Sequence, residues 1–395
     1  MVKNKLLLIS PAFPPPLVGG SKVWTYNMVE NSGGNFDILT SELKDGEEEI
    51  VSSKHNVIRS KYLWDSNEND PTRLELILSY LYIIFYVVKT KFTHNYDVIV
   101  AGAFDFANGF IFLLGKILNI KVVGLGNAEE FTLAIYGSSV TYRIKRKWMY
   151  LTHKWCDGFI VVCDYCGDIL RKIGVTKQPI FVVPSCIDPK KVKKQKLNNK
   201  KKITYNVLSV GRIVERKGFH DLIAAVEKLK NTIPEIKLTI VGNGPYKFKL
   251  EELVKKKQLE NYVYLAGNVE DVELARIYSD SDLFVLAHRM LKNGDTEGCP
   301  TVFSEAGGQG IPLIGGDDAG ASTAIDDGVN GFLVDCKNIN LLADTIKKVL
   351  LDNDLREKMS TAAIKKVKKD HLPKIAGERF YNAVMSFRPT TKRTN

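Results

Sequence analysis

The sequence lacks an apolar run long enough to span a bilayer, and it has few cysteines. Its longest apolar stretch, residues 76–88, is interrupted by Ser79 and three tyrosines, whereas a membrane-spanning helix needs about 20 residues. The apolar run at residues 6–9 is too short for a signal peptide and is followed by Pro11. Six cysteines in 395 residues, without a secretory signal, favour reduced thiols and a cytoplasmic location.

Glycine and proline are not in excess, which excludes collagen-like and low-complexity chains. The length and a hydrophobic content of 45% suffice for two or three domains with buried cores. The net charge is +11. A basic surface attracts nucleic acid, anionic membranes and phosphorylated small molecules alike, so the charge does not choose among these partners.

Short apolar runs alternate with helical periodicities along the whole chain. Such runs, bounded by turn residues, are typical of parallel strands buried on both faces. The sequence therefore predicts two doubly wound α/β domains. In the first, strands are predicted at 5–10, 98–102, 121–124, 158–162 and 180–183 and helices at 74–91 and 142–154; in the second, strands at 205–210, 237–242, 262–266, 283–287, 311–315 and 331–334 and a helix at 219–230.

A change in composition separates the two series of strands. Residues 191–202 are rich in lysine and asparagine, and they predict a basic linker between an N-terminal domain (1–190) and a C-terminal domain (203–370). Residues 371–395 are predicted to form a helix that packs back on the N-terminal domain and to end in a frayed tail. Because ligands of doubly wound sheets bind beyond the carboxyl ends of the strands, a cleft between the domains is the expected active site.

Two cations follow the first strand of the C-terminal domain. Arg212 offers a planar fork for phosphate oxygens and Lys217 a compact charge, and both precede a helix that opens near Gly218. Two cations fixed in this way can bind phosphate groups and stabilise negative charge that develops on them. The alternative is a solvated basic turn.

Two carboxylates, Glu297 and Glu305, flank a predicted helix start. Pro300 suits the first helical position, where its missing N–H costs nothing. The N–H groups of Thr301 and Val302 would then form an anion site. Since Glu297 precedes the helix and Glu305 lies more than one turn inside it, the two are expected to have different roles.

These segments together resemble the donor domain of glycosyltransferase family 4, and the resemblance extends over nearly the whole chain. The matching elements are Ser209-Val210-Gly211-Arg212, Lys217-Gly218, Gly242-Asn243-Gly244 and the pair Glu297 and Glu305. The family implies a retaining enzyme with the GT-B fold, two doubly wound Rossmann-like domains facing each other across a cleft. It also implies that Arg212 and Lys217 hold the diphosphate, Glu297 contacts sugar hydroxyls and Glu305 holds the ribose. Further donor-binding positions implied by the resemblance are Gly19, Gly20, Gly211, Gly242, Gly244, Val269, Gly298, Cys299, Pro300, Thr301 and Val302.

Two segments resemble one particular group of family members. Gly294-Asp295-Thr296-Glu297-Gly298 and Pro184-Ser185-Cys186-Ile187-Asp188 are similar to those of phosphatidylinositol mannosyltransferase-like members, which use GDP-mannose and a lipid acceptor at the membrane surface. On the acceptor side, Asn127 stands where many relatives have a histidine, with Glu129 and Glu130 beside it. Asparagine can bind a sugar hydroxyl but cannot relay a proton.

The expected function is the retaining transfer of a mannose- or glucose-type hexose from a GDP- or UDP-linked sugar to a hydroxyl acceptor, either lipid-linked or a polysaccharide precursor. The catalytic residues would be Arg212, Lys217 and Glu297, with no cofactor and no metal, and no nucleic-acid partner is expected. Because no carboxylate in the donor motif stands out as a nucleophile, front-face displacement is favoured. The alternatives are an isomerase resembling UDP-sugar 2-epimerases, and a basic membrane- or nucleic-acid-binding protein without catalysis.

Five other signals are present, and most of them are interpreted as structural. Asp280-Ser281-Asp282 is expected to cap or turn rather than to bind metal, and Cys163 and Cys166 are expected to be structural thiols. Gly307-Gly308 inside a helix indicates a close packing contact. The basic and aromatic residues of 143–155 indicate either a helix face that rests on anionic lipid at the inner face of a membrane or a solvated face with a buried tryptophan. Residues 76–88, apolar nearly all round, are expected to form a core helix.

Overall fold

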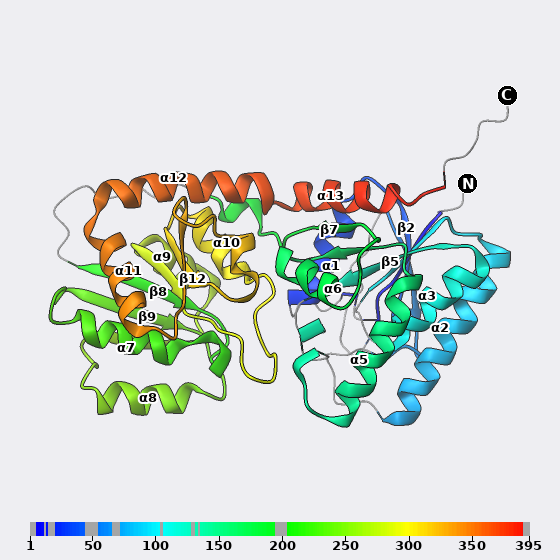
Figure 1. Ribbon diagram of the computed structural model, residues 1–395. Coiled ribbons are helices and arrows are strands. Elements are labelled where there is room, and N and C mark those ends of the chain that lie inside the picture. Colours follow the sequence, from blue (N-terminus) through cyan, green and yellow to red (C-terminus); the bar gives the residue numbers. More distant parts are fainter. Residues whose placement is uncertain are drawn as a thin grey trace. The chain divides into compact units, whose positions relative to one another are not determined.

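The computed structural model describes residues 5–11, 13–14, 20–43, 54–64, 72–102, 106–127, 131–132, 135–193 and 204–389. The chain forms two units (Figure 1). One contains Met1–Ser185 together with Pro373–Asn395, and the other contains Cys186–Leu372. Most of the predicted linker lies outside the described residues. Residues 186–193 join the second unit through hydrogen bonds such as Ile187 N to His371 O, at 3.0 Å.

The N-terminal unit is built on a parallel seven-stranded sheet in the order β3-β2-β1-β4-β5-β6-β7. The five predicted strands are confirmed, whereas β2 and β3 were not predicted because Asp37, Asn56 and Arg59 interrupt their apolar pattern. The strands are β1 (Leu6–Ile9), β2 (Phe36–Ser41), β3 (Asn56–Ser60), β4 (Val98–Ala101), β5 (Lys121–Gly126), β6 (Gly158–Val161) and β7 (Ile180–Val182). The helices are α1 (Gly20–Glu30), α2 (Arg73–Thr93), α3 (Phe106–Leu118), α5 (Val140–Thr152), α6 (Asp164–Lys172) and α13 (Pro373–Met385), with the 3-10 turn η1 (His153–Trp155).

The second unit is built on a parallel six-stranded sheet in the order β10-β9-β8-β11-β12-β13. All six predicted strands and the predicted helix are present within two residues of their expected ends. The strands are β8 (Tyr205–Val210), β9 (Ile236–Val241), β10 (Val263–Gly267), β11 (Leu283–Leu286), β12 (Leu313–Gly316) and β13 (Gly331–Val334). The helices are α7 (Phe219–Leu229), α8 (Lys247–Lys256), α9 (Asp271–Ser279), α10 (Thr301–Gly308), α11 (Ile339–Leu351) and α12 (Asn353–Asp370), with the 3-10 turns η2 (Pro189–Lys191), η3 (Glu215–Lys217) and η4 (Ala319–Thr323).

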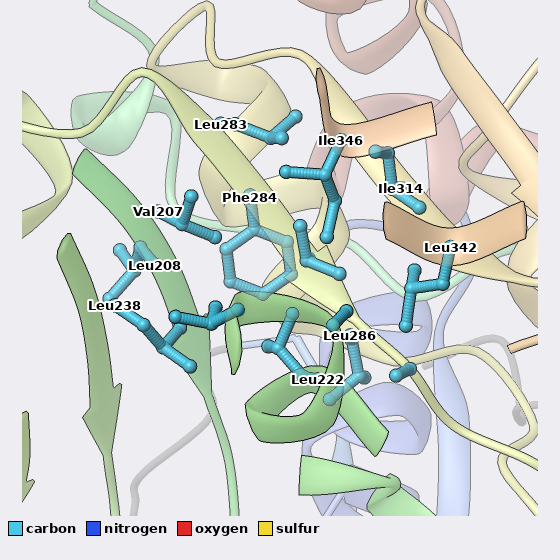
Figure 2. Close-up of a cluster of buried hydrophobic side chains, with 14 of the residues drawn as sticks. Val207, Leu208, Leu222, Leu238, Leu283, Phe284, Leu286, Ile314, Leu342 and Ile346 are labelled. Carbon is cyan, nitrogen blue, oxygen red and sulfur yellow. The ribbon is translucent and has the colours of Figure 1, made fainter. Parts of the chain in front are cut away.

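The core of the second unit lies between its sheet and the pair α7 and α11. Figure 2 shows Phe284 of β11 at the centre of this cluster, with Leu222 of α7 and Ile346 of α11 beside it. All three side chains are fully buried. Burial of one such side chain stabilises the fold by roughly 2 kcal/mol, so this core holds the strand ends in fixed positions.

The order of the second sheet reverses between β8 and β11. From β8 the chain continues outward to β9 and β10, and it then returns to place β11 on the other side of β8. The connections that leave these two neighbouring strands therefore diverge and open a crevice at their carboxyl ends. Both segments that carry the predicted donor residues begin at this crevice.

Helix α10 packs closely against its surroundings through its two glycines, as predicted. A Cβ atom on Gly308 would lie 3.0 Å from Cδ1 of Ile187, and one on Gly307 would lie 3.3 Å from Cγ2 of Val367 on α12. The absence of side chains at these positions lets α10 approach α12 and fixes the direction in which its N-terminus points.

Helix α2 corrects two expectations. It has 21 residues, and by length and composition it could cross a membrane, whereas the sequence analysis treated its apolar stretch as too short. It is also not a core helix, because only 28% of its most apolar window is buried. One side, with Ile83 and Val87, packs into the unit, and the other side is left uncovered.

Candidate active site

Two glycine-containing loops meet at the carboxyl ends of β8 and β9. Gly211 and Gly242 have φ angles of +151° and +131°. A Cβ atom on Gly242 would lie 2.1 Å from the carbonyl oxygen of Gly211, and one on Gly244 would lie 2.3 Å from that of Ile213. Ile213 N also donates to Asn243 O at 2.8 Å. The glycines thus let the two loops pack backbone against backbone, which a side chain at either position would prevent.

Lys217 and Glu297 form a buried ion pair at the crevice between β8 and β11. Lys217 ends the turn η3, and its Nζ lies 2.9 Å from Oε2 of Glu297. Arg216 contacts the other carboxylate oxygen of Glu297, and its Nε lies 3.0 Å from Oδ1 of Asp295. The structure thus brings together two cations and two carboxylates from segments about 80 residues apart in the sequence.

The position of Lys217 makes its charge sensitive to what binds beside it. Burial and, next, the neighbouring Arg216 lower the pKa of Lys217 to about 7. A lysine titrating near neutrality is readily charged by an incoming anion.

Arg212 occupies a different place from Lys217. Its side chain is exposed on the loop between Gly211 and Ile213, outside the buried cluster. It is therefore accessible from solvent beside the glycine loops. The structure places the two predicted diphosphate ligands on one loop but brings only Lys217 into contact with Glu297.

Helix α10 begins one residue later than predicted. Pro300 is its N-cap, with an extended backbone (φ −61°, ψ 110°), and the Pro300 carbonyl accepts from Phe303 N at 3.1 Å. Thr301 and Val302 are therefore the first two helical residues, and their N–H groups point out of the helix N-terminus. The half-buried residues Gly298 and Cys299 join this N-terminus to Glu297.

Glu305 lies in the second turn of α10 and is held by two partners. Its carboxylate lies 2.8 Å from Nζ of Lys191 and accepts from the Tyr278 hydroxyl at 3.2 Å. Burial first, and then Glu305, raise the pKa of Tyr278 well above its ordinary value, so this hydroxyl stays a neutral donor. Burial lowers the pKa of Lys191, but the carboxylates of Glu305, Asp271 and Asp188 together outweigh it and the net shift is upward. These contacts hold Glu305 at a position separate from that of Glu297. The separation agrees with the predicted positions of the two glutamates, one before the helix and one inside it.

The sequence analysis assigned no role to several charged residues around this cluster. Arg289, which follows β11, contacts both Asp221 and His220 of α7. The buried His288 ring accepts from Gly316 N at 3.3 Å through Nδ1, and its Nε2 faces the Asp318 carbonyl at 3.1 Å. Nδ1 also lies 3.1 Å from the carbonyl oxygen of Leu286, and burial lowers the pKa of His288, which favours a neutral ring.

The predicted residues of the N-terminal unit are only partly described. Asn127 follows β5 and donates from Nδ2 to Oγ of Ser21 at 2.9 Å. Gly20 is the first residue of α1, and a Cβ atom there would meet nothing within 4 Å. Gly19, Glu129 and Glu130 lie outside the described residues. In the second unit, Val269 lies just beyond β10 and is half-buried.

The structural interpretation of two short motifs is confirmed. Asp282 accepts from Asn206 N at 2.9 Å, and Asp280 is the C-cap of α9. Cys163 and Cys166 are buried free thiols at the start of α6, with their Sγ atoms 3.1 Å apart. In the part of the chain that the structure describes, no group of three or more His, Cys, Asp or Glu residues could hold a metal ion.

Two family models match consecutive parts of the chain. Glycosyltransferase Family 4 matches residues 18–191, and Glycosyl transferases group 1 matches residues 188–366. A GDP-mannose-dependent alpha-(1-6)-phosphatidylinositol monomannoside mannosyltransferase of Mycobacterium tuberculosis is 31% identical over 157 residues, 40% of this chain and 41% of the relative. The putative colanic acid biosynthesis glycosyltransferase WcaL of Escherichia coli is 28% identical over 220 residues, 54% of this chain and 53% of the relative. The matching segments thus span between two fifths and about half of these relatives.

Solved structures resemble the chain over nearly its full length. Sucrose-phosphate synthase from Thermosynechococcus elongatus has a TM-score of 0.70 at 20% identity, over 94% of this chain and 96% of that one. Anabaena Alr3699/HepE in complex with UDP has a TM-score of 0.71 at 18% identity, over 97% and 100%. At these identities the likeness shows the fold, and it confirms the predicted GT-B architecture.

Proposed function

We propose that this chain, a member of the glycosyltransferases, transfers a hexose from a nucleotide-diphosphate sugar to a hydroxyl acceptor with retention of the anomeric configuration. The first part of the chain matches Glycosyltransferase Family 4, and the second part matches Glycosyl transferases group 1. The observation that carries this proposal is the buried cluster of Lys217, Arg216 and Glu297 at the carboxyl ends of β8 and β11. Cations and carboxylates buried together at the switch point of a doubly wound sheet are typical of a ligand site.

In this proposal the leaving diphosphate is the group that the second unit stabilises. Its oxygens would rest on the loops at Gly211 and Gly242, with Arg212 and Lys217 supplying positive charge and the N-terminus of α10 supplying N–H donors. Glu297, anchored by Arg216, would accept from sugar hydroxyls, and Glu305 from the ribose. Front-face displacement assisted by the diphosphate then requires no nucleophilic side chain and no metal.

The names of the relatives guide the choice of substrates. The Mycobacterium tuberculosis relative is named as GDP-mannose-dependent and the Anabaena structure contains UDP. We therefore propose a GDP- or UDP-linked hexose of mannose or glucose type as donor, and a lipid-linked acceptor or polysaccharide precursor, used at the cytoplasmic side of a membrane.

A thermal-shift panel with GDP, UDP, ADP and their common sugars tests the donor site. A nucleotide at about 100-fold over its dissociation constant should add ~2.7 kcal/mol to the stability of the unit that binds it. Arg212→Ala removes an exposed cation, so it should abolish this shift without affecting the fold. The matched control is Arg276→Ala, which removes an exposed arginine from α9 and should leave the shift unchanged. No shift with any nucleotide would contradict the donor-site assignment.

Product analysis separates transfer from isomerisation. Incubation of the donor with glycan or lipid acceptors should give a product whose anomeric proton coupling, measured by NMR, matches that of the donor sugar. Release of an epimerised sugar without any acceptor would instead support the isomerase alternative.

A further inference from the structure

The outer side of α2 exposes a continuous line of apolar side chains. Leu74, Leu78, Leu81, Phe85 and Phe92 recur at helical spacing along one side, and Leu81 and Phe85 are 57% and 58% exposed. Scattered exposed apolar residues are ordinary, but a contiguous line of large ones marks an interaction surface.

The apolar line on α2 belongs to a larger layer. Helix α2 packs beside α3, and α3 packs beside α5, so the three helices cover one face of the N-terminal sheet together (Figure 1). Helix α5 exposes Val140, Ile144 and Leu151, again at helical spacing. We call the outer side of α2, α3 and α5 the three-helix surface.

Positive charge is concentrated on the same three helices. Together they carry eight lysines and arginines and one carboxylate, Glu75. Helix α5 has no acidic residue, and Arg143 and Lys147 are exposed beside its apolar side chains. The three helices therefore have a net charge of +7, eight cations less one carboxylate.

From this combination we infer that the three-helix surface binds the face of an anionic lipid bilayer. Apolar side chains would enter the acyl boundary while lysines and arginines contact lipid phosphates. A second copy of the chain is a poorer occupant, because it would bring two strongly positive surfaces together. Spanning by α2 is also disfavoured, since Ile83, Tyr86 and Val87 on its inner side are packed into the unit.

Trp148 does not take part in this contact. Its ring packs against Phe110 of α3, with centroids 4.9 Å apart, and Gly109 leaves room for its indole. Leucine and phenylalanine side chains on α2, rather than the tryptophan considered in the sequence analysis, supply the apolar contact.

Vesicle co-sedimentation of the full-length protein tests this surface. The protein should bind phosphatidylcholine vesicles that contain phosphatidylglycerol, bind much less to phosphatidylcholine alone, and lose binding at high salt. Arg143→Gln/Lys147→Gln should weaken binding by roughly 25-fold, at about fivefold for each cation. The matched control, Lys255→Gln/Lys256→Gln on the exposed side of α8, should have little effect.

A second pair of variants tests the apolar part. Leu81→Gln/Phe85→Gln should weaken binding to anionic vesicles, whereas Phe248→Gln, at an equally exposed apolar position on α8, should not. The proposal would be overturned if each variant and its control on α8 lost vesicle binding equally, or if the protein did not bind anionic vesicles. So would a dimer in solution that Leu81→Gln/Phe85→Gln dissociates. Because the assay uses no sugar nucleotide, its outcome is independent of the proposed transfer reaction.

Discussion

At the scale of single residues, Lys217 is the group whose chemistry the structure defines most sharply. Its burial distinguishes it from a surface lysine, and its contact with Glu297 fixes the position of its amino group. Arg216 holds the same carboxylate from the other side. This arrangement lets Lys217 respond to a bound anion while Glu297 keeps a partner.

Binding of a nucleotide sugar is expected to take up a proton at Lys217. With its pKa lowered to about 7, the lysine is mostly neutral at about pH 8 and mostly charged at about pH 6. A bound diphosphate favours the charged form and raises this pKa again. Proton uptake should therefore approach about one proton at pH 8 and be small at pH 6, and affinity should fall as pH rises above 7. Titration calorimetry in buffers of different ionisation enthalpy measures the number of protons taken up on binding. Equal proton uptake at both pH values would contradict the role of Lys217.

Lys217→Met should affect turnover far more than folding. Removal of one cation that stabilises a leaving diphosphate is expected to lower kcat by roughly 100- to 1,000-fold. The fold should lose much less than the ~3–5 kcal/mol typical of an orphaned buried charge, because Glu297 keeps its contact with Arg216. Steady-state kinetics and thermal unfolding of the same preparation test this. Wild-type turnover in Lys217→Met would remove the residue from the mechanism.

The residues of this cluster were only partly predictable from sequence. Lys217 and Glu297 were found through a family motif, but their contact depends on β8 and β11 being neighbours, which no local pattern encodes. Arg216 was missed because the family motif calls for two diphosphate-binding cations, and Arg212 and Lys217 already filled those two positions. Its role becomes visible only when Asp295 and Glu297 are placed in space.

At the scale of elements, the loops after β8, β9 and β10 differ in how much room their glycines have. Gly242 and Gly267 both have positive φ, but a Cβ atom on Gly242 would lie 2.1 Å from a backbone oxygen, whereas one on Gly267 would meet only Nζ of Lys247 at 3.6 Å. The loop at Gly242 therefore cannot accept a side chain without moving the loop at Gly211, whereas the backbone at Gly267 has room for one.

Gly242→Ala should consequently be much more damaging than Gly267→Ala. The positive φ alone costs about 1–2 kcal/mol at Gly267, whose φ of +70° is close to the left-handed helical region, and more at Gly242, whose φ is +131°. In Gly242→Ala the clash with Gly211 adds to this cost and displaces the loop that carries Arg212, so nucleotide binding should be lost as well. Chemical denaturation and nucleotide thermal shifts of the two variants test this. Equal destabilisation, with binding retained in both, would show that the two loops do not need their close approach.

Strand positions were the most predictable feature of the fold and helix exposure the least. The strands of the second unit are buried runs bounded by turn residues, and their sequence pattern is unambiguous. Helix α2 is apolar nearly all round, a pattern that ordinarily indicates burial. Which side stays uncovered depends on what packs against the helix, and that is a property of the assembled layer of α2, α3 and α5.

At the scale of the whole chain, the two units differ in how they are built from the sequence. The second is one continuous segment, Cys186–Leu372, with its own core, and it contains Arg212, Lys217, Glu297 and Glu305. The first is completed only by the last segment of the chain. There, α13 packs on α1, and Phe380 lies 5.6 Å from Phe36 between ring centroids.

Truncation after Leu372 should therefore separate folding of the first unit from nucleotide binding by the second. Loss of buried Phe380 alone is expected to cost about 3–5 kcal/mol, and truncation also removes the close contact of Gly377 with the end of α1. Calorimetry should show a weakened transition for the first unit and a transition for the second that nucleotide still shifts upward. A chain ending at Pro389, which keeps all of α13, is the control and should behave as the full chain does. Loss of the nucleotide shift on truncation after Leu372, with the second transition intact, would mean that donor binding needs residues of the first unit, and the donor site would then have to be assigned to both units.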